Sequence, residues 1–275
     1  MSESTDTADA FAAFERAGWE SGRASPYHQG LGAMTSRPIP ALLDAAAVGP
    51  DSAVLDVATG PGYAAALAAE RGATVVAVDL SRDMLDLAAQ LHPEIEFRQA
   101  DANALPFEDA TFDAVVSNLL MPHVSDLPAV VLELARVVRR GGRVALSTWD
   151  PEPPTYLKAM FEVFAASGAV PPLELPPGPS FFQYGTEHEF RALLAGAGLG
   201  DPAVESVRFT HRIDDVDGFI ADLIAGTVRM GVLLEAQPPD IQARFRDGFA
   251  ERVEGWRSGA GYELPCAIKV GSGTR

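Results

Sequence analysis

The segment that most constrains this chain runs from Val54 to Gly62. It reads Val-Leu-Asp-Val-Ala-Thr-Gly-Pro-Gly, an apolar strand that ends in an acidic residue and enters a turn with two glycines. The alanine-rich stretch that follows predicts a helix whose N-terminal N–H groups point at the turn. Because glycine has no Cβ, Gly60 and Gly62 allow a ligand to approach the backbone closely. The segment indicates a nucleotide-cofactor turn, and a plain strand-to-helix turn is the alternative.

Strands and helices alternate through the following hundred residues. The predicted strands cover 53–57, 74–79, 95–99, 112–117 and 143–149, and the predicted helices cover 62–71, 82–91 and 127–139. Ser81 and Asp126 are suited to cap the second and third of these helices, and Gly141-Gly142 is expected to end the third. Apolar strands that alternate with helices indicate a parallel sheet covered on both faces.

Further elements flank this core. Helices are expected at 8–18 and 38–47, and Thr186 with Glu189 forms a capping box that opens a helix to about 197. Strands are expected at 203–212 and 264–270, with mostly helical structure at 216–256. We interpret residues 1–275 as one domain, comprising an N-terminal helical cap (1–50), a cofactor-binding core (51–150) and two lid insertions (151–200 and 214–262).

Composition excludes several classes of partner. The chain has 38 acidic against 21 basic residues, a formal net charge of −17, which disfavours nucleic acid and anionic membrane surfaces. Cys266 is the single cysteine, which fits a reducing cytoplasm. The polar N-terminus does not resemble a signal peptide, no apolar run is long enough for a membrane span, and no Cys/His spacing indicates a metal site.

Two cofactor classes fit the turn. Gly60-x-Gly62-x-x-Ala65 matches a dinucleotide fingerprint, with Asp79 at the distance of a ribose contact. Three further features point elsewhere: Asp56 inside the strand end, Asp101-Ala102 after the third strand, and the segment 105–118. The alternatives for Asp79 and Asp101 are an exposed turn residue and a turn cap.

At these residues the chain resembles class I S-adenosylmethionine-dependent methyltransferases, and within them the small-molecule group that includes the ubiquinone and menaquinone enzymes. The resemblance is carried by VLDVATGPG (54–62), VVAVDLSRDML (75–85), FRQADANALPFEDATFDAVVSN (97–118), ELARVVRRGGRVALSTW (133–149) and LPCAIKVGSG (264–273). It implies an α/β, Rossmann-like, seven-stranded mixed sheet of order 3-2-1-4-5-7-6 with an antiparallel last strand.

The resemblance also implies roles for individual positions. The methionine part of the cofactor is expected at Asp56 and at the turn residues Ala58, Thr59, Gly60 and Gly62. Asp79 followed by Leu80 is expected to bind the ribose, Met84 and Asp101-Ala102 the adenine, and Asn118 is expected beside the transferable methyl group. Trp19, Tyr27, Thr35 and Arg37 resemble the family's residues ahead of the first strand.

The physical character of these residues agrees with the resemblance. A sulfonium cation with ribose and adenine donors suits an acidic cleft rich in hydrogen-bond acceptors. Tyr27 and Arg37 could reach the methionine carboxylate, for which arginine is the natural bidentate partner. The alternative places Tyr27 in the core and Arg37 in solvent.

The acceptor is described less fully by the sequence. His123, after the fourth strand, is the first candidate for a general base, and His28 is the second; a structural role is the alternative for both. Apolar residues predict either a hydrophobic acceptor pocket or the core of a lid: Met160, Phe161, Phe164, Leu173, Leu175, Phe181, Phe182, Tyr184, Met230 and Leu233.

The leading functional hypothesis is O- or C-methylation of a hydrophobic natural product or quinone-like molecule in secondary metabolism. S-adenosyl-L-methionine is then the cofactor, S-adenosyl-L-homocysteine the product, and the protein a monomer or homodimer. A cyclase or rearrangement enzyme that uses the same cofactor and a non-catalytic binding module stay open. An NAD-linked dehydrogenase is disfavoured because no residue set for hydride transfer is visible.

Overall fold

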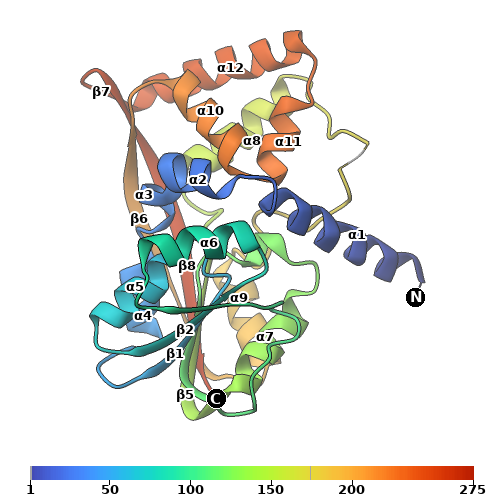
Figure 1. The fold of residues 1–275 in the computed structure, drawn as a ribbon. Helices are drawn as coiled ribbons and strands as arrows, with labels where there is room; N and C mark the ends of the chain where they lie inside the picture. Colours follow the sequence, from blue (N-terminus) through green and yellow to red (C-terminus); the bar gives the residue numbers. More distant parts are fainter. Residues whose placement is uncertain (1, 174) are drawn as a thin grey trace.

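A mixed β-sheet forms the centre of the molecule (Figure 1). The computed structural model describes residues 2–173 and 175–275, with side chains from residue 10 onward. The sheet order is β3-β2-β1-β4-β5-β8-β6, and β8 runs antiparallel to both of its neighbours. The strands are β1 (Ala53–Val57), β2 (Thr74–Asp79), β3 (Glu96–Gln99), β4 (Phe112–Ser117), β5 (Val138–Trp149), β6 (Gly200–Ile213), β7 (Arg257–Ser258) and β8 (Gly261–Thr274).

This topology confirms the predicted order, with β8 as the seventh long strand. The short β7, which pairs with β8 through Arg257 and Ser258, has no counterpart in the sequence prediction. Two residues are too few to give a hydrophobic period that could be recognised.

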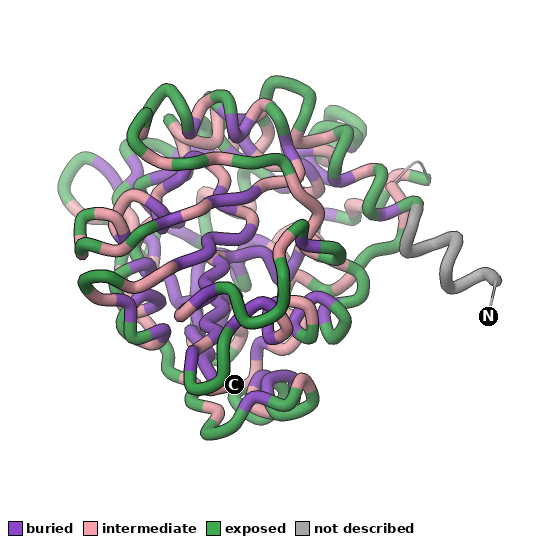
Figure 2. The backbone as a smooth tube through the Cα atoms, turned by 60° about the horizontal axis from the view of Figure 1, so that its bottom comes forward, coloured by how far each residue is buried: buried purple, intermediate pink, exposed green. Residues whose placement is uncertain are grey.

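Side-chain alternation along the strands gives the sheet two buried faces. Leu55 and Val115 pack with α7 (Leu127–Val137) and α9 (Glu187–Gly196), whereas Val54 and Val116 pack with α4 (Ile39–Ala45) and α5 (Tyr63–Glu70). α6 (Arg82–Leu91) contacts β2 and β3. Buried positions gather in the interior of the molecule, and exposed ones lie mainly on its outer turns and helices (Figure 2).

One predicted boundary was wrong. The helix before β5 ends at Val137, and Gly141-Gly142 lies inside β5 instead of ending the helix. Val138 already pairs with Phe112 on β4, and the register then shifts before Ala114 pairs with Arg143. Gly141 has φ +79°, and a Cβ on Gly142 would lie 2.5 Å from the Asp113 carbonyl oxygen. The two glycines thus form a strand irregularity, because strand pairing competes with the helix and prevails.

A second layer of helices covers the carboxyl ends of β1, β2 and β4. It contains α1 (Ser2–Trp19), α2 (Ala24–Pro26), η1 (Tyr27–Leu31), α3 (Gly32–Thr35), η2 (Met121–His123), α8 (Tyr156–Ala166), α10 (Val216–Gly226), α11 (Arg229–Glu235), α12 (Pro239–Val253) and η3 (Glu254–Trp256). We call this layer the cap.

The cap has its own apolar core, which joins distant segments. Leu31 and Met34 from the N-terminal part pack with Tyr156 of α8 and with Phe219 and Phe249 of the C-terminal helices. Within residues 2–173 and 175–275, no helix combines the length and the apolarity that a bilayer crossing needs.

Candidate active site

A cavity of about 610 Å³ lies between the sheet and the cap. It opens where β1, β2 and β4 end, on either side of the point at which the strand order reverses. Cofactor sites of open α/β sheets lie at such a reversal. Residues from α1, η1, the three strand ends, α8 and α11 share its wall.

The Asp56–Gly62 turn forms the floor of this cavity. Asp56 is 1 % exposed, and its Oδ2 accepts hydrogen bonds from Thr59 Oγ1 (2.6 Å) and from the Ala65 backbone N–H (3.0 Å). Asp56, Ala58, Thr59 and Gly60 line the cavity, as the sequence predicts. Gly60 has φ +53° and would place a Cβ in open space, so this backbone presents an uncrowded surface to the cavity.

The second oxygen of Asp56 is buried and unsatisfied. Oδ1 has no hydrogen-bond partner among the described residues. Burial raises the pKa of Asp56 to about 7, although the bonds from Thr59 and Ala65 act in the opposite direction. A buried acceptor without a donor has a free-energy cost that a bound donor or cation would relieve.

This raised pKa predicts a pH dependence of stability. Between about pH 4 and pH 7 the folded state holds a proton on Asp56 that the unfolded chain releases, so this residue makes the unfolding free energy fall as pH rises. We expect Asp56→Asn, which cannot titrate, to gain stability relative to the wild type across that window. Urea unfolding of both proteins at about one-unit pH steps measures the difference, and a constant difference would contradict the assignment.

Asp79 joins the turn to the end of β2. Its Oδ2 accepts from the Gly60 N–H (2.8 Å) and its Oδ1 from the Ser81 N–H (2.9 Å). Burial raises the pKa of Asp79, while those backbone bonds lower it. Ser81 caps α6 by accepting from the Met84 N–H (3.2 Å), which fixes Met84 in the cavity wall beside Leu80.

Asp101 and Ala102 also line the cavity. Asp101 Oδ1 accepts from the Asn103 backbone (2.9 Å) and from Asn103 Nδ2 (2.8 Å), so this carboxylate stabilises its own turn. Its other oxygen lies 3.6 Å from the Arg16 guanidinium of α1. Asp101 therefore caps its own turn, as the alternative interpretation predicts, and it also lines the cavity.

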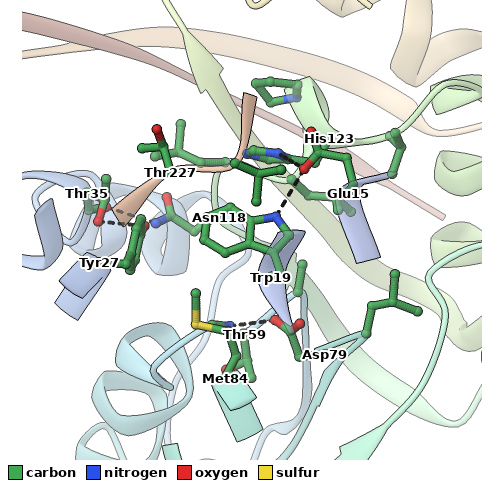
Figure 3. A pocket seen from close by; sticks show the side chains of 18 of the residues that line it. Glu15, Trp19, Tyr27, Thr35, Thr59, Asp79, Met84, Asn118, His123 and Thr227 are labelled. Carbon is green, nitrogen blue, oxygen red and sulfur yellow. Dashed lines mark hydrogen bonds and ion pairs between the residues drawn. The ribbon is translucent and has the colours of Figure 1, made fainter. Parts of the chain in front are cut away.

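A chain of hydrogen bonds joins the ends of β4 and β5 to the N-terminal segment, and Figure 3 shows three of its members, Tyr27, Thr35 and Asn118. Asn118 Nδ2 donates to the Thr35 carbonyl oxygen (2.9 Å), and Asn118 Oδ1 accepts from Ser147 Oγ (2.7 Å). Tyr27 OH donates to Thr35 Oγ1 (2.8 Å), and burial raises the pKa of Tyr27. These contacts place Tyr27, Thr35 and Asn118 together on one side of the cavity.

Three predicted site residues do not reach the cavity wall. Arg37 is exposed, with its guanidinium 5.9 Å from the centre of the Phe209 ring, because it follows α3 on the outer side of the chain. His28 lies behind Tyr63, and its Nδ1 is 2.6 Å from Tyr63 OH. Gly62 has φ +84° and caps α5, with its Cβ position facing His92 and Phe97. Arg37, His28 and Gly62 therefore lie outside the described cavity wall, and their predicted ligand contacts stay predictions.

His123 does line the cavity, and its neighbours could not be foreseen. Its Nδ1 lies 2.9 Å from Oε2 of Glu15, and the same oxygen accepts from Trp19 Nε1 at 3.1 Å (Figure 3). Glu15 and Trp19 stand four positions apart on α1, the spacing that puts two residues on one helix face. That spacing is the one sequence signal for Glu15, and it does not indicate His123, 108 residues away.

The predicted lid residues divide between cavity and core. Met160, Phe181 and Met230 line the cavity, whereas Phe161, Phe164 and Phe182 pack within the cap core. Leu233 is buried and Leu173 is fully exposed. Residue 174, which follows Leu173, lies outside the described residues. Tyr156 and Arg229 are among the wall residues that sequence reasoning did not assign to the site.

Comparison with known proteins agrees with this geometry. Residues 55–146 match the family described as "Methyltransferase domain". An uncharacterized protein of Mycobacterium tuberculosis is 40% identical over 117 residues, which are 41% of this chain and 43% of that protein. A demethylmenaquinone methyltransferase of Beutenbergia cavernae is 34% identical over 131 residues, 48% of this chain and 55% of that one. The chain spans about half the length of these curated relatives.

Similarity to solved structures extends over nearly the whole chain. Phosphoethanolamine N-methyltransferase 2 of Haemonchus contortus, solved with phosphomonomethylethanolamine and S-adenosylhomocysteine, superposes with a TM-score of 0.58 at 17% identity. The match covers 96% of this chain and 60% of that one. At this identity the likeness concerns the fold. With the match over residues 55–146 and the observed strand order, it shows that the chain has the Rossmann-like methyltransferase fold.

Proposed function

We propose that this chain binds S-adenosyl-L-methionine in the cavity and methylates an oxygen or carbon atom of a hydrophobic small molecule. The observation that carries the proposal is the charge of the cavity. Among its described wall residues, five are acidic, Glu15, Asp56, Asp79, Asp101 and Asp126, and Arg229 is the one arginine or lysine. An acidic wall favours a cation over a pyrophosphate.

The residues present fit this cofactor. The unpartnered Oδ1 of Asp56 is a buried acceptor on the floor formed by the glycine turn. We assign the methionine part to this floor, the ribose hydroxyls to Asp79 and the adenine to Met84 and Asp101-Ala102. Tyr27 and Asn118 border the same space. A carboxylate offers two oxygens to two hydroxyl donors, which suits Asp79 to a ribose.

The bound cofactor supplies an electrophilic methyl group and a thioether leaving group. The chain's own contribution is to orient the acceptor, to exclude water and to hold a proton. Trp149, Leu157, Met160, Phe181 and Met230 give the cap side of the cavity an apolar wall. That wall supports an apolar acceptor more than a charged peptide or a nucleic acid.

Tyr156 supplies a polar group within this wall. It is 1 % exposed and lines the cavity, and burial raises its pKa well above the ordinary value, so the phenol stays neutral. We assign it a hydrogen bond to the acceptor.

The single cysteine supports a cytoplasmic location for the enzyme. We also propose that the protein is a monomer or homodimer. The acceptor class supports a role in secondary metabolism.

Product mass tests the proposal. The protein is incubated with S-adenosylmethionine and a library of apolar phenols, enols and quinols, and the products are analysed by mass spectrometry. A gain of one methyl group in an acceptor, with release of S-adenosylhomocysteine, is the expected result. A product with an unchanged mass and a new skeleton would indicate a rearrangement enzyme instead of a methyltransferase. Cofactor binding without any product across the library would favour a binding module.

A further inference from the structure

Glu15 is a buried carboxylate at the acceptor side of the cavity, for which the family resemblance provides no role. Its side chain is 4 % exposed, and it lies on α1 in the wall of the cavity. Oε2 receives both Trp19 Nε1 and His123 Nδ1, and Oε1 has no partner among the described residues. Removing a carboxylate from water is costly, so a purely structural helix contact would not favour an acid here.

The contact with Glu15 determines which nitrogen of His123 carries the proton. An ionised carboxylate only accepts hydrogen bonds, and Trp19 Nε1 only donates. His123 Nδ1 must therefore be the donor in the 2.9 Å contact. In the neutral ring the lone pair then lies on Nε2, which makes no hydrogen bond with the described residues, on a side chain that is 32 % exposed and lines the cavity.

Charged groups from three other elements face this pair. His123 acts to lower the pKa of Asp79 at the end of β2, and Glu15 acts to raise the pKa of Arg229 on α11. Arg229 lies 4.1 Å from the centre of the Phe181 ring, and burial lowers its pKa while Glu15 acts in the opposite direction. Asp126 lines the same cavity. Glu15 is the acid among them that touches His123, so it is the group that orients the ring.

We propose that Glu15 is a positioning residue that holds His123 with Nε2 as the proton acceptor, and that the methyl acceptor is an apolar molecule with a weakly acidic hydroxyl group, a phenol or enol. The inference rests on the proposed function. In the proton step, the acceptor O–H bond breaks, an N–H bond forms at Nε2, and the electron pair stays on the acceptor oxygen. The imidazolium is stabilised by Glu15 and later releases its proton to water.

The first test reads the tautomer directly, without an acceptor. Nitrogen-15 NMR of histidine-labelled protein with S-adenosylhomocysteine, assigned through His123→Asn, is expected to show the Nδ1–H tautomer in the wild type. Glu15→Leu is expected to lose it. Glu15→Gln keeps an accepting oxygen and Trp19→Phe keeps the carboxylate, so both are expected to retain it. An unchanged tautomer in Glu15→Leu would overturn the positioning role.

The second test compares two acceptors at the same pH. For an apolar phenol that is neutral at the assay pH, Glu15→Leu and His123→Asn are expected to lower kcat by about 10-fold and about 100-fold, with KM nearly unchanged. An electron-poor nitrophenol ionises without a base, and we expect wild type and variants to methylate it at similar rates. Equal losses of kcat with both phenols would mean that Glu15 has a structural role alone. Methylation of apolar amines but of no phenol would overturn the proposed acceptor class.

The outcome also separates this inference from the proposed function. Calorimetric titration of the wild type with S-adenosylhomocysteine comes first. No binding would contradict the proposed function itself. Binding, followed by a tautomer that does not depend on residue 15, would contradict the inference alone.

Discussion

We expect Asp79→Ala to raise the dissociation constant for S-adenosylhomocysteine by at least about 100-fold. Hydrogen bonds to a charged partner contribute about 1.5–3 kcal/mol each, and this carboxylate is assigned two of them from the ribose. The substitution also frees the N–H groups of Gly60 and Ser81, which Asp79 now holds at 2.8 and 2.9 Å. The loss of the ribose hydrogen bonds weakens cofactor binding, and the release of the two N–H groups weakens it further by loosening the turn.

Ligand-induced thermal shifts and calorimetry measure this effect. The wild type is expected to melt at a higher temperature with S-adenosylhomocysteine and at an unchanged temperature with NAD. Asp79→Asn keeps one accepting oxygen and is expected to lie between the wild type and Asp79→Ala. Asp86→Asn, at an exposed carboxylate paired with Arg82, is the matched control and should bind like the wild type. Stabilisation by NAD alone would contradict the cofactor assignment.

The second large effect is expected in the core, at Lys269 on β8. Its side chain is 4 % exposed and contacts Asp150 Oδ1 at 3.0 Å and the Glu152 carboxylate. Burial lowers the pKa of Lys269, but the bonds with the two carboxylates outweigh this and the net shift is upward. Asp150 is 1 % exposed and also accepts from Ser206 Oγ, so β5, β6 and β8 meet at this ion pair.

Lys269→Met is expected to lower the unfolding free energy by about 3–5 kcal/mol, because it leaves the Asp150 charge buried without its cation. Urea denaturation gives the value. Adding Asp150→Asn removes the stranded charge, so the double variant should recover much of the loss. Arg82→Met, at an exposed pair, serves as the control and should change little. A small effect of Lys269→Met would mean that water reaches Asp150.

The sheet could be predicted because its signals are local. The bounds of β1, β2 and β4 agree with the apolar runs, and Ser81, Asp126 and Thr186 cap the helices expected of them. The strand order came from resemblance, since the register between strands depends on contacts that are distant in sequence. Gly141-Gly142 was misread for the same reason: pairing with β4 outweighs the local signal for a helix end.

The cofactor side of the cavity was also largely predictable. Asp56, Asp79 and Asp101 lie at the carboxyl ends of three parallel strands, which must lie together at one edge of the sheet, and all three line the cavity. Arg37 and His28 lie outside the cavity wall because their position depends on how η1 and α3 turn, and no period in the sequence specifies that. Their side chains point to Phe209 and Tyr63 instead.

By itself, the sequence determined the strands, their caps and the acidic residues at the strand ends, because hydrophobic period and turn chemistry act over a few residues. Only the tertiary structure brought α1 against η2 and placed Glu15 against His123, 108 residues apart. It also joined Tyr156 and Arg229 to the same wall. Those contacts arise from the packing of helices that are distant in sequence, which no local pattern encodes.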